Sequence, residues 1–372
     1  MHNMDFERFR AIDLRWQNIE QSYRIEPYTA PTNLELARKS AMASYASGVP
    51  YSPVFEYAQP PDFPVRDIYE FIKTLRFEDS LLERIYYFAA QQELLSINAV
   101  QTHSPSVITG QTALAFGIPS DNLVNSAKAI LASVPTNSST SRPDEVMSAE
   151  NTAVEMQKLL GKCGLEQWSA TTFSPMSAKV SVNRLDKMIK IREHTVFSSQ
   201  EIRRLFVHEI GVHVFRSENG ARQPLGIFGR GLPGYLDTEE GLAVLVEEKA
   251  GVSDPATMRK YAARVVGSAV ALNQPFSEVF GTIAPDVGPE AAFEIASRAK
   301  RGFRDTSEPG AHTKDIVYLK GYLEVKKYVD THPEDFEILW AGKYGLTDIG
   351  WVKQMIEDSD LKRPLFVHMP LI

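Results

Sequence analysis

Cysteine is almost absent from this sequence, since Cys163 is the only one in 372 residues. A single thiol cannot form an intramolecular disulfide or build a thiolate zinc site, so any metal must be held by histidine and carboxylate side chains. Long apolar runs are also missing, because the sequence has no uncharged stretch of about 18 apolar residues, the length that crosses a bilayer. The first sixteen residues carry charges instead of an apolar core, so we expect no signal peptide, no membrane partner and a cytoplasmic protein.

An excess of positive charge is missing as well. The chain has 40 basic and 47 acidic residues, which gives a formal net charge of -7. This balance argues against a general partner of nucleic acid or of anionic membranes. Hydrophobic residues make up 43% of the chain, which is enough to bury the core of a folded enzyme.

Apolar residues at helical spacing dominate the chain, and a polar stretch at residues 135–143 is the best candidate linker. We therefore expect a helical N-terminal region over residues 1–135 and a catalytic region over residues 136–372. Helices are predicted over residues 5–20, 33–47, 65–76, 80–101, 144–161, 198–217, 238–249, 254–271, 289–304, 314–330 and 345–357.

A β-hairpin gives the clearest strand signal. Apolar and polar residues alternate over residues 178–193, on both sides of a turn at residues 183–187. The predicted fold class is therefore α+β, mainly helical, with a small β-sheet beside the helix at residues 198–217.

That helix carries the strongest functional motif, His-Glu-x-x-x-His, with His208, Glu209 and His213. In the usual zinc-peptidase motif the histidines are four residues apart and share one face of an α-helix. Five residues would separate them by roughly 140° on a regular helix. A π-bulge would bring them back together, and such bulges occur preferentially at functional sites. We expect a bulge near Gly211, two zinc-binding imidazoles, and Glu209 as general base; the alternative is a buried helix whose histidines only hydrogen-bond to neighbours.

A catalytic zinc site needs a third protein ligand. Glu239 and Glu240 begin a helix 26 and 27 residues after His213, and Glu240 is the preferred ligand. Acidic residues also favour helix N-termini through the helix dipole alone, which leaves a purely structural role open. Glu247 lies two helical turns after Glu240. It is a candidate to contact one of the metal ligands from the side that faces away from the metal. A donor is also needed for the oxyanion, and the candidates are Tyr318, His312 and Tyr235.

Four segments resemble the tyrosine carboxypeptidase family that includes the microtubule-associated enzyme and bacterial proteins named for a QEGLA motif. They are HEIGVH, NGARQPLGIFGRGLPGYL, EEGLA at residues 239–243 and TKDIVYLKGY at residues 313–322. The resemblance implies a zinc carboxypeptidase fold in which His208, His213 and Glu240 bind the metal and Glu209 is catalytic. It also implies hydrolysis of the C-terminal residue of a protein or peptide, tyrosine in the tubulin-directed member.

An enzyme of this kind needs a cation for the terminal carboxylate of its substrate. The candidates are Arg301, Arg304 and Lys314, in and just before the family-like TKD segment, although basic residues also favour helix ends. The acidic chain has no long basic extension for acidic tubulin tails, so another protein or peptide is an alternative substrate.

Two other functions stay open. A zinc endopeptidase could use the hairpin at residues 178–193 as an edge strand for an extended substrate, and it would cut an amidated peptide as well as a free one. A non-catalytic regulatory or scaffolding protein would keep zinc for stability, and Glu209→Gln would leave its activity unchanged.

Overall fold

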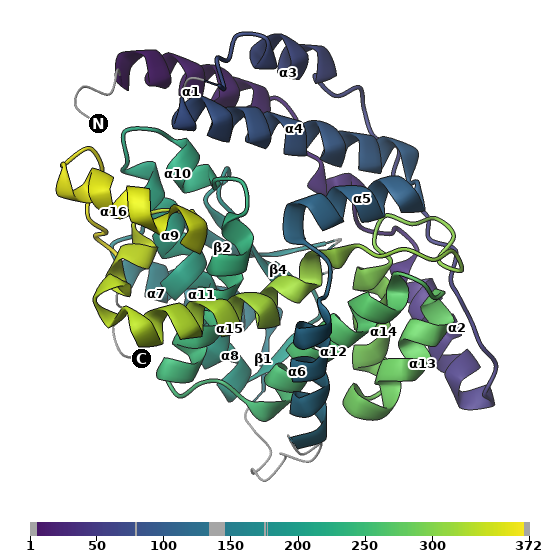
Figure 1. Cartoon of the computed structure of the whole chain (residues 1–372). Helices are drawn as coiled ribbons and strands as arrows, with labels where there is room; N and C mark the ends of the chain where they lie inside the picture. The colour runs from purple at the N-terminus through teal and green to yellow at the C-terminus, as the bar shows by residue number, and fades with distance from the viewer. Residues whose placement is uncertain (1–5, 79, 134–145, 175, 177, 368–372) are drawn as a thin grey trace. The chain divides into compact units, whose positions relative to one another are not determined.

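The computed structural model of the chain describes residues 6–78, 80–133, 146–174, 176 and 178–367. Most of this part is helical, with two small sheets, as expected for a mainly helical α+β protein (Figure 1). The predicted linker at residues 135–143 lies outside the described residues, and the division at residue 135 stays a prediction. None of the described helices is both long and apolar enough to cross a membrane.

The chain forms two compact units, each assembled from separate segments. Unit 1 contains residues 1–21, 140–253 and 321–372, and unit 2 contains residues 22–139 and 254–320. Helix α15 (Val317–Thr331) begins in unit 2 and continues into unit 1.

Unit 1 holds both sheets and the helix with the histidine motif. Large side chains such as Trp168, Phe197, Phe215 and Trp340 are fully buried in its core. Its other elements are α1 (Phe6–Gln21), β1 (Val146–Ser148), α7 (Ala149–Lys162), β2 (Ser169–Phe173), β3 (Val180–Asn183), β4 (Met188–Arg192), β5 (Val196–Ser198), α8 (Ser199–Leu205), η2 (Phe206–Val214), α9 (Phe215–Ala221), α10 (Ile227–Arg230), α11 (Tyr235–Lys249), η4 (Pro333–Asp335), η5 (Glu337–Trp340), η6 (Leu346–Asp348) and α16 (Ile349–Glu357).

The predicted hairpin is confirmed, and it is part of a larger sheet. Strand β3 pairs antiparallel with β4, with Val180 opposite Ile191. The sheet order is β2-β4-β3, and β2, which alternation did not predict, pairs parallel with β4. Strand β3 also contacts the η2 helix, so the small sheet lies beside the histidine motif as expected.

The predicted distortion of the motif helix is confirmed and is longer than one turn. The helix starts as α8, where the Ser198 side chain accepts a hydrogen bond from the Glu201 backbone N–H. It changes to a π-helix over the nine residues of η2 and returns to α-helix in α9. The indole N–H of Trp340 donates to the Gly211 carbonyl at 2.8 Å inside this π segment. A side chain from the C-terminal part of unit 1 therefore supports the wider turn.

Two glycines let α11 and α15 touch backbone to backbone. A Cβ atom added to Gly241 would lie 2.1 Å from the Gly321 carbonyl carbon. One added to Gly321 would lie 1.9 Å from the Asp237 carbonyl oxygen. No other residue fits at either position without moving a helix.

In the described part of unit 2 the regular elements are helices, apart from an isolated bridge between Val54 and Asp305. Its helix α12 contacts α6, α13 and α14, which makes it central to the unit. The elements are η1 (Glu26–Tyr28), α2 (Leu34–Ser47), α3 (Val65–Ile72), α4 (Leu81–Thr102), α5 (Pro105–Phe116), α6 (Asp121–Ser133), α12 (Pro255–Ala271), α13 (Phe276–Val287), α14 (Pro289–Ala299) and η3 (Thr313–Ile316).

Several predicted helix boundaries were wrong, since α3 ends at Ile72 instead of residue 76, α9 ends at Ala221 instead of residue 217 and α16 begins at Ile349 instead of residue 345. The two largest errors have a clear cause. The helix expected over residues 144–161 begins at Ala149, because residues 146–148 form β1 and the Ser148 side chain caps the helix instead. The helix expected over residues 289–304 ends at Ala299, and the chain then turns at Gly302 with a φ of 89°. A positive φ of this size is incompatible with helix and is easily adopted by glycine.

Candidate metal centre

His208 and His213 lie on the same face of the π-helix. Their ring centroids are 4.7 Å apart and the rings are inclined by 78°. Both residues are buried, with 5% and 9% of their surface exposed. The wider turn of η2 therefore offsets the five-residue spacing, as the sequence predicted.

Glu240 completes a group of three possible ligands. Its Oε2 atom is 3.3 Å from His208 Nε2 and 3.6 Å from His213 Nε2. One ligand atom from each residue lies within 4.8 Å of the others. Glu240 comes from the first turns of α11, next to Gly241, so the close contact of α11 with α15 holds the helix that carries it.

The outer nitrogen of each imidazole contacts a second carboxylate. His208 Nδ1 is 2.7 Å from Glu247 Oε1, and His213 Nδ1 is 2.9 Å from Glu239 Oε1. A carboxylate accepts the Nδ1 proton, so each Nε2 lone pair is directed towards the Glu240 side. This tautomer is the one that binds metal through Nε2.

Glu239 is occupied by cations. Its Oε2 accepts a hydrogen bond from Arg216 Nη1 at 2.6 Å, and its Oε1 is 2.9 Å from Lys343 Nζ. Burial raises the pKa of Glu239, but Lys343 and Arg216 outweigh burial and hold the pKa well below its ordinary value. Both oxygens of Glu239 are thus engaged on the far side of His213, whereas Glu240 lies with the Nε2 atoms.

The carboxylates favour a positive charge at His208. Burial lowers the pKa of this imidazole, but hydrogen bonds with Glu240 and Glu247 outweigh burial and raise the pKa to about 10. The same negative field favours a bound dication. Two Nε2 atoms and one carboxylate oxygen form the donor set of a catalytic zinc site, so these residues fit zinc.

Glu209 and Tyr235 are the other predicted residues of unit 1. Glu209 is 7% exposed, and its charge contributes to the raised pKa of His208. Tyr235 packs against Gly231, and Lys343 Nζ lies 5.8 Å from the centre of its ring. Burial is the main cause of the raised pKa of Tyr235, and the charges of Glu239 and Glu240 also act on this hydroxyl.

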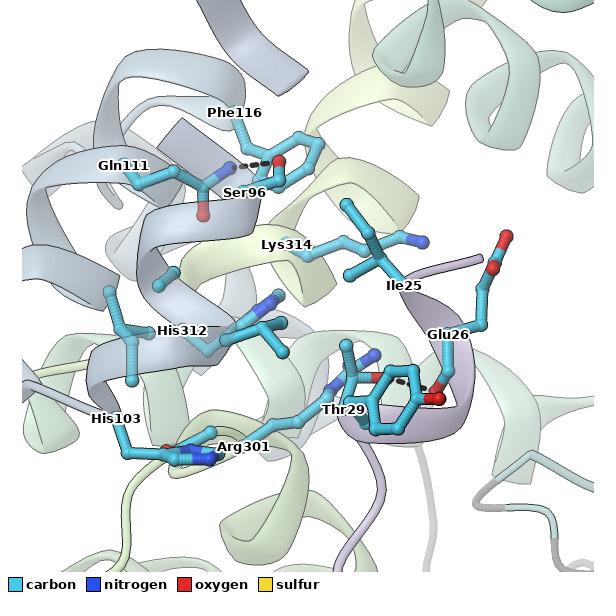
Figure 2. Close-up of a pocket in the computed structure, with 15 residues that line it drawn as sticks. Ile25, Glu26, Thr29, Ser96, His103, Gln111, Phe116, Arg301, His312 and Lys314 are labelled. Carbon is cyan, nitrogen blue, oxygen red and sulfur yellow. Dashed lines mark hydrogen bonds between the residues drawn. The ribbon is translucent and has the colours of Figure 1, made fainter. Parts of the chain in front are cut away.

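The remaining predicted residues belong to unit 2. Arg301, His312 and Lys314 line one cavity of this unit, shown in Figure 2. Arg304 is exposed and does not line that cavity. The ring of Tyr318 stacks on Tyr261 at 5.0 Å and is covered by the Arg264 guanidinium at 4.5 Å.

Sequence reasoning missed the cations that hold the outer carboxylates. Arg216 is fully buried, and its remaining donors bond to the carbonyls of Gly342 and Tyr344. A charged residue next to the apolar segment of the motif was a usable signal, because buried charges are normally paired. Nothing in the sequence linked Lys343 to the site, because it lies more than 100 residues after the histidine motif.

Comparison with known proteins gives one family. The family model described as microtubule-associated tyrosine carboxypeptidase matches residues 45–371. MATCAP2 of Mus musculus, named provisionally as a tyrosine carboxypeptidase, is 35% identical over 168 residues, covering 43% of this chain and 31% of that protein. The microtubule-associated tyrosine carboxypeptidase 1 of Mus musculus is 36% identical over 182 residues, covering 44% of this chain and 38% of that protein. The matches span about a third of the length of these relatives.

Proposed function

Because the chain belongs to the microtubule-associated tyrosine carboxypeptidase family, we propose that it is a zinc-dependent carboxypeptidase. The observation that supports the zinc site is that the buried side chains of His208, His213 and Glu240 come close together in unit 1. The substrate class is the free C-terminus of a protein or peptide. Tyrosine is the proposed terminal residue, because the relatives are named for it, and the cytoplasm is the proposed location.

The proposed mechanism assigns a separate task to each side chain. His208, His213 and Glu240 would hold a zinc ion, which would supply a Lewis acid for the scissile carbonyl and for a water molecule. Glu209 accepts the proton of the attacking water and returns it to the leaving amine. Glu247 and Glu239 fix the tautomers of the two imidazoles so that the Nε2 atoms stay available.

Other residues remain proposals for substrate contact. Arg301, Arg304 and Lys314 are candidates for the terminal carboxylate, and Tyr318, His312 and Tyr235 for the oxyanion. Tyr235 is the candidate that shares unit 1 with the proposed ligands.

The first experiment measures metal content by elemental mass spectrometry on folded wild type and three variants. We expect one zinc per chain in wild type and loss of zinc in His208→Ala, His213→Ala and Glu240→Ala. Glu209→Gln should keep its zinc, because this residue is not a ligand, and should lose activity by about 10²–10⁴-fold, the usual contribution of a general base.

Peptide assays separate the proposed activity from its alternatives. Wild type should release the last residue of a peptide with a free carboxylate and leave the amidated peptide intact. Equal cleavage of both peptides, at internal bonds, would favour the endopeptidase. A zinc-loaded wild type without activity on any peptide library would favour the scaffolding role and contradict the proposal.

A further inference from the structure

The sequence NGARQ at residues 219–223 belongs to a family-like segment, but neither the proposed zinc site nor the proposed mechanism uses it. Two of its side chains, Asn219 and Gln223, are buried amides with 1% and 7% of their surface exposed. Burying an amide without hydrogen-bond partners costs free energy, so buried amides are almost always paired. The partners of Asn219 and Gln223 therefore indicate what this sequence does.

Asn219 binds the backbone of the irregular segment after α16, residues 361–367, which we call the strap. Its Oδ1 accepts hydrogen bonds from the backbone N–H groups of Leu365 and Phe366, at 2.8 and 3.1 Å. Its Nδ2 donates to the Phe366 carbonyl at 2.7 Å. The ring of Phe366 also packs on Phe215, with the ring centroids 5.4 Å apart. Because an amide both donates and accepts, Asn219 holds the strap as a neighbouring strand would.

Gln223 holds the strap in the same way at its other end. Its Oε1 accepts from the Lys362 backbone N–H at 2.8 Å, and its Nε2 donates to the Lys362 carbonyl at 2.9 Å. The same Nε2 donates to the Ala341 carbonyl at 2.8 Å. Ala341 follows Trp340, whose indole donates to the Gly211 carbonyl inside the π-helix. Gln223 therefore ties the strap to the segment that supports the π-helix.

Arg216 connects this arrangement to a proposed zinc ligand. It lies three residues before Asn219 on α9, which continues directly from the π-helix. Its guanidinium donates to two carbonyls of residues 342–344, at 3.0 and 2.8 Å. It also donates to Glu239, whose other oxygen is 2.9 Å from His213 Nδ1. A continuous series of hydrogen bonds thus leads from the strap, through one helix, to an imidazole.

The π-helix needs support of this kind. Most π-helical segments are single turns, whereas η2 extends over nine residues. We propose that Asn219 and Gln223 are positioning residues of the zinc site. By binding the strap they hold α9, and α9 keeps the π-helix in the geometry that brings His208 and His213 together. The link to zinc rests on the proposed function, whereas the effect on the helix exists without metal.

The first test measures the helix in the full chain without metal. Hydrogen exchange with a chelator present, followed by mass spectrometry, reports local opening of residues 206–221. Leu365→Pro removes the N–H that Asn219 accepts, whereas Leu365→Ala keeps this N–H and changes a side chain that is 61% exposed. We expect exchange at least about tenfold faster in Leu365→Pro, because a buried acceptor loses its donor. Leu365→Ala should exchange like wild type.

The second test measures the effect on metal binding. Competition with a fluorescent zinc chelator should give about tenfold weaker binding in Leu365→Pro and unchanged binding in Leu365→Ala, as for other groups that orient metal ligands. The absorption spectrum of cobalt(II), offered in place of zinc, reports ligand geometry and should change in Leu365→Pro only. Faster exchange with unchanged zinc affinity and an unchanged spectrum would overturn the positioning role. A wild type that binds neither metal would contradict the proposed function, and hydrogen exchange would still test the strap.

A double-mutant cycle tests the contact from its other side. Asn219→Ala removes the amide that holds Leu365 and Phe366, so it should speed exchange as Leu365→Pro does. The double variant should exchange no faster than the faster single variant, because both changes break one contact. Additive effects, or exchange like wild type in both single variants, would overturn the proposal.

A second matched pair covers the case in which circular dichroism shows that Leu365→Pro does not fold. Lys362→Pro removes the N–H that Gln223 accepts, and Lys362→Ala keeps it at an exposed position. Faster exchange of residues 206–221 and weaker zinc binding in Lys362→Pro alone would support the proposal. Equal behaviour of the two variants would contradict it.

Discussion

At the scale of single residues, each proposed zinc-binding imidazole has a carboxylate behind it and a cation behind that carboxylate. Glu247 accepts from His208 and lies 3.0 Å from Arg204 Nη1. Glu239 accepts from His213 and bonds to Arg216. Ligands held in this way lose little freedom when metal binds, because their orientation is already fixed.

Glu247→Gln should weaken zinc binding by about 10–100-fold, which is the usual effect of removing a partner behind a metal-bound histidine. Glutamine keeps the size of the side chain but removes the charge that orders His208. Competition with a fluorescent zinc chelator measures the affinity.

The neighbouring Glu248→Gln is the matched control. Among the described residues, the side chain of Glu248 hydrogen-bonds with Tyr322 and Lys326 at the surface. Its substitution should leave zinc affinity unchanged. Equal affinity of wild type and Glu247→Gln would show that Glu247 has no role in ordering His208.

The central residues of the candidate site could be predicted because they lie in short motifs. His208, Glu209, His213 and Glu240 follow from spacing and residue type, and the family resemblance that those motifs carry is confirmed. The sequence left Glu239 as an alternative metal ligand, but it did not predict the hydrogen bond between Glu239 and the outer nitrogen of His213. The choice between adjacent glutamates depends on helix rotation, which Gly241 and Gly321 control, and on the distant cation Lys343.

At the scale of elements, the crossing of α11 and α15 tolerates no side chain. Gly321→Ala would place a Cβ 1.9 Å from the Asp237 carbonyl oxygen, so one helix must move. We expect a loss of about 1–3 kcal/mol or more in the free energy of unfolding, the usual cost of overpacking. Urea denaturation followed by circular dichroism measures this loss, and zinc titration should show weaker binding because Glu240 moves with α11.

Gly161→Ala provides the control within the same unit. Nothing lies within 4 Å of a Cβ at this position in α7. This substitution should leave unfolding unchanged or stabilise by up to about 1 kcal/mol, because alanine favours helix over glycine. If Gly321→Ala were as stable as Gly161→Ala, the close contact of the two helices would be wrong.

Most helices could be predicted from apolar periodicity, but α5, α6 and α13 were missed. Helix α5 has apolar residues around its whole circumference and so shows no single apolar stripe. Helices α6 and α13 do have buried apolar residues at three- and four-residue spacing, so the sequence carried a usable signal for both. Strand β2 was missed because its pairing with β4 is a parallel contact across intervening chain. Such pairings depend on tertiary packing, and local periodicity does not encode them.

At the scale of the whole molecule, buried neutral histidines should make stability depend on pH. Burial, followed by the charge of Arg301, lowers the pKa of His312 well below its ordinary value of 6.5. The unfolded chain therefore binds a proton below pH 6.5 that the folded His312 does not bind, so the contribution of His312 to stability falls as the pH falls. The raised pKa of His208 acts in the opposite direction, because its contribution to stability falls as the pH rises above 6.5. The loss for one such imidazole is up to about 1.4 kcal/mol per pH unit.

Urea unfolding at about pH 7.5 and about pH 5.5, with chelator present, measures this dependence. His312→Gln should lose less stability on acidification than wild type, whereas His332→Gln, at an exposed position, should behave like wild type. The same loss in wild type and His312→Gln would contradict the prediction. The low pKa of Asp315 contributes only at more acidic pH, below the ordinary carboxyl value of 3.8.

The segmented construction of unit 1 has a consequence for biosynthesis. A nascent chain elongated as far as residue 320 already contains both histidines, Glu240 and the outer glutamates, but neither Trp340 nor Lys343. At that stage the Gly211 carbonyl lacks its indole donor, and Glu239 lacks one of its two cations. The contacts of Trp340 and Lys343 with this site can form only after the ribosome has synthesised the last segment of unit 1. Metal binding should therefore follow translation of this segment.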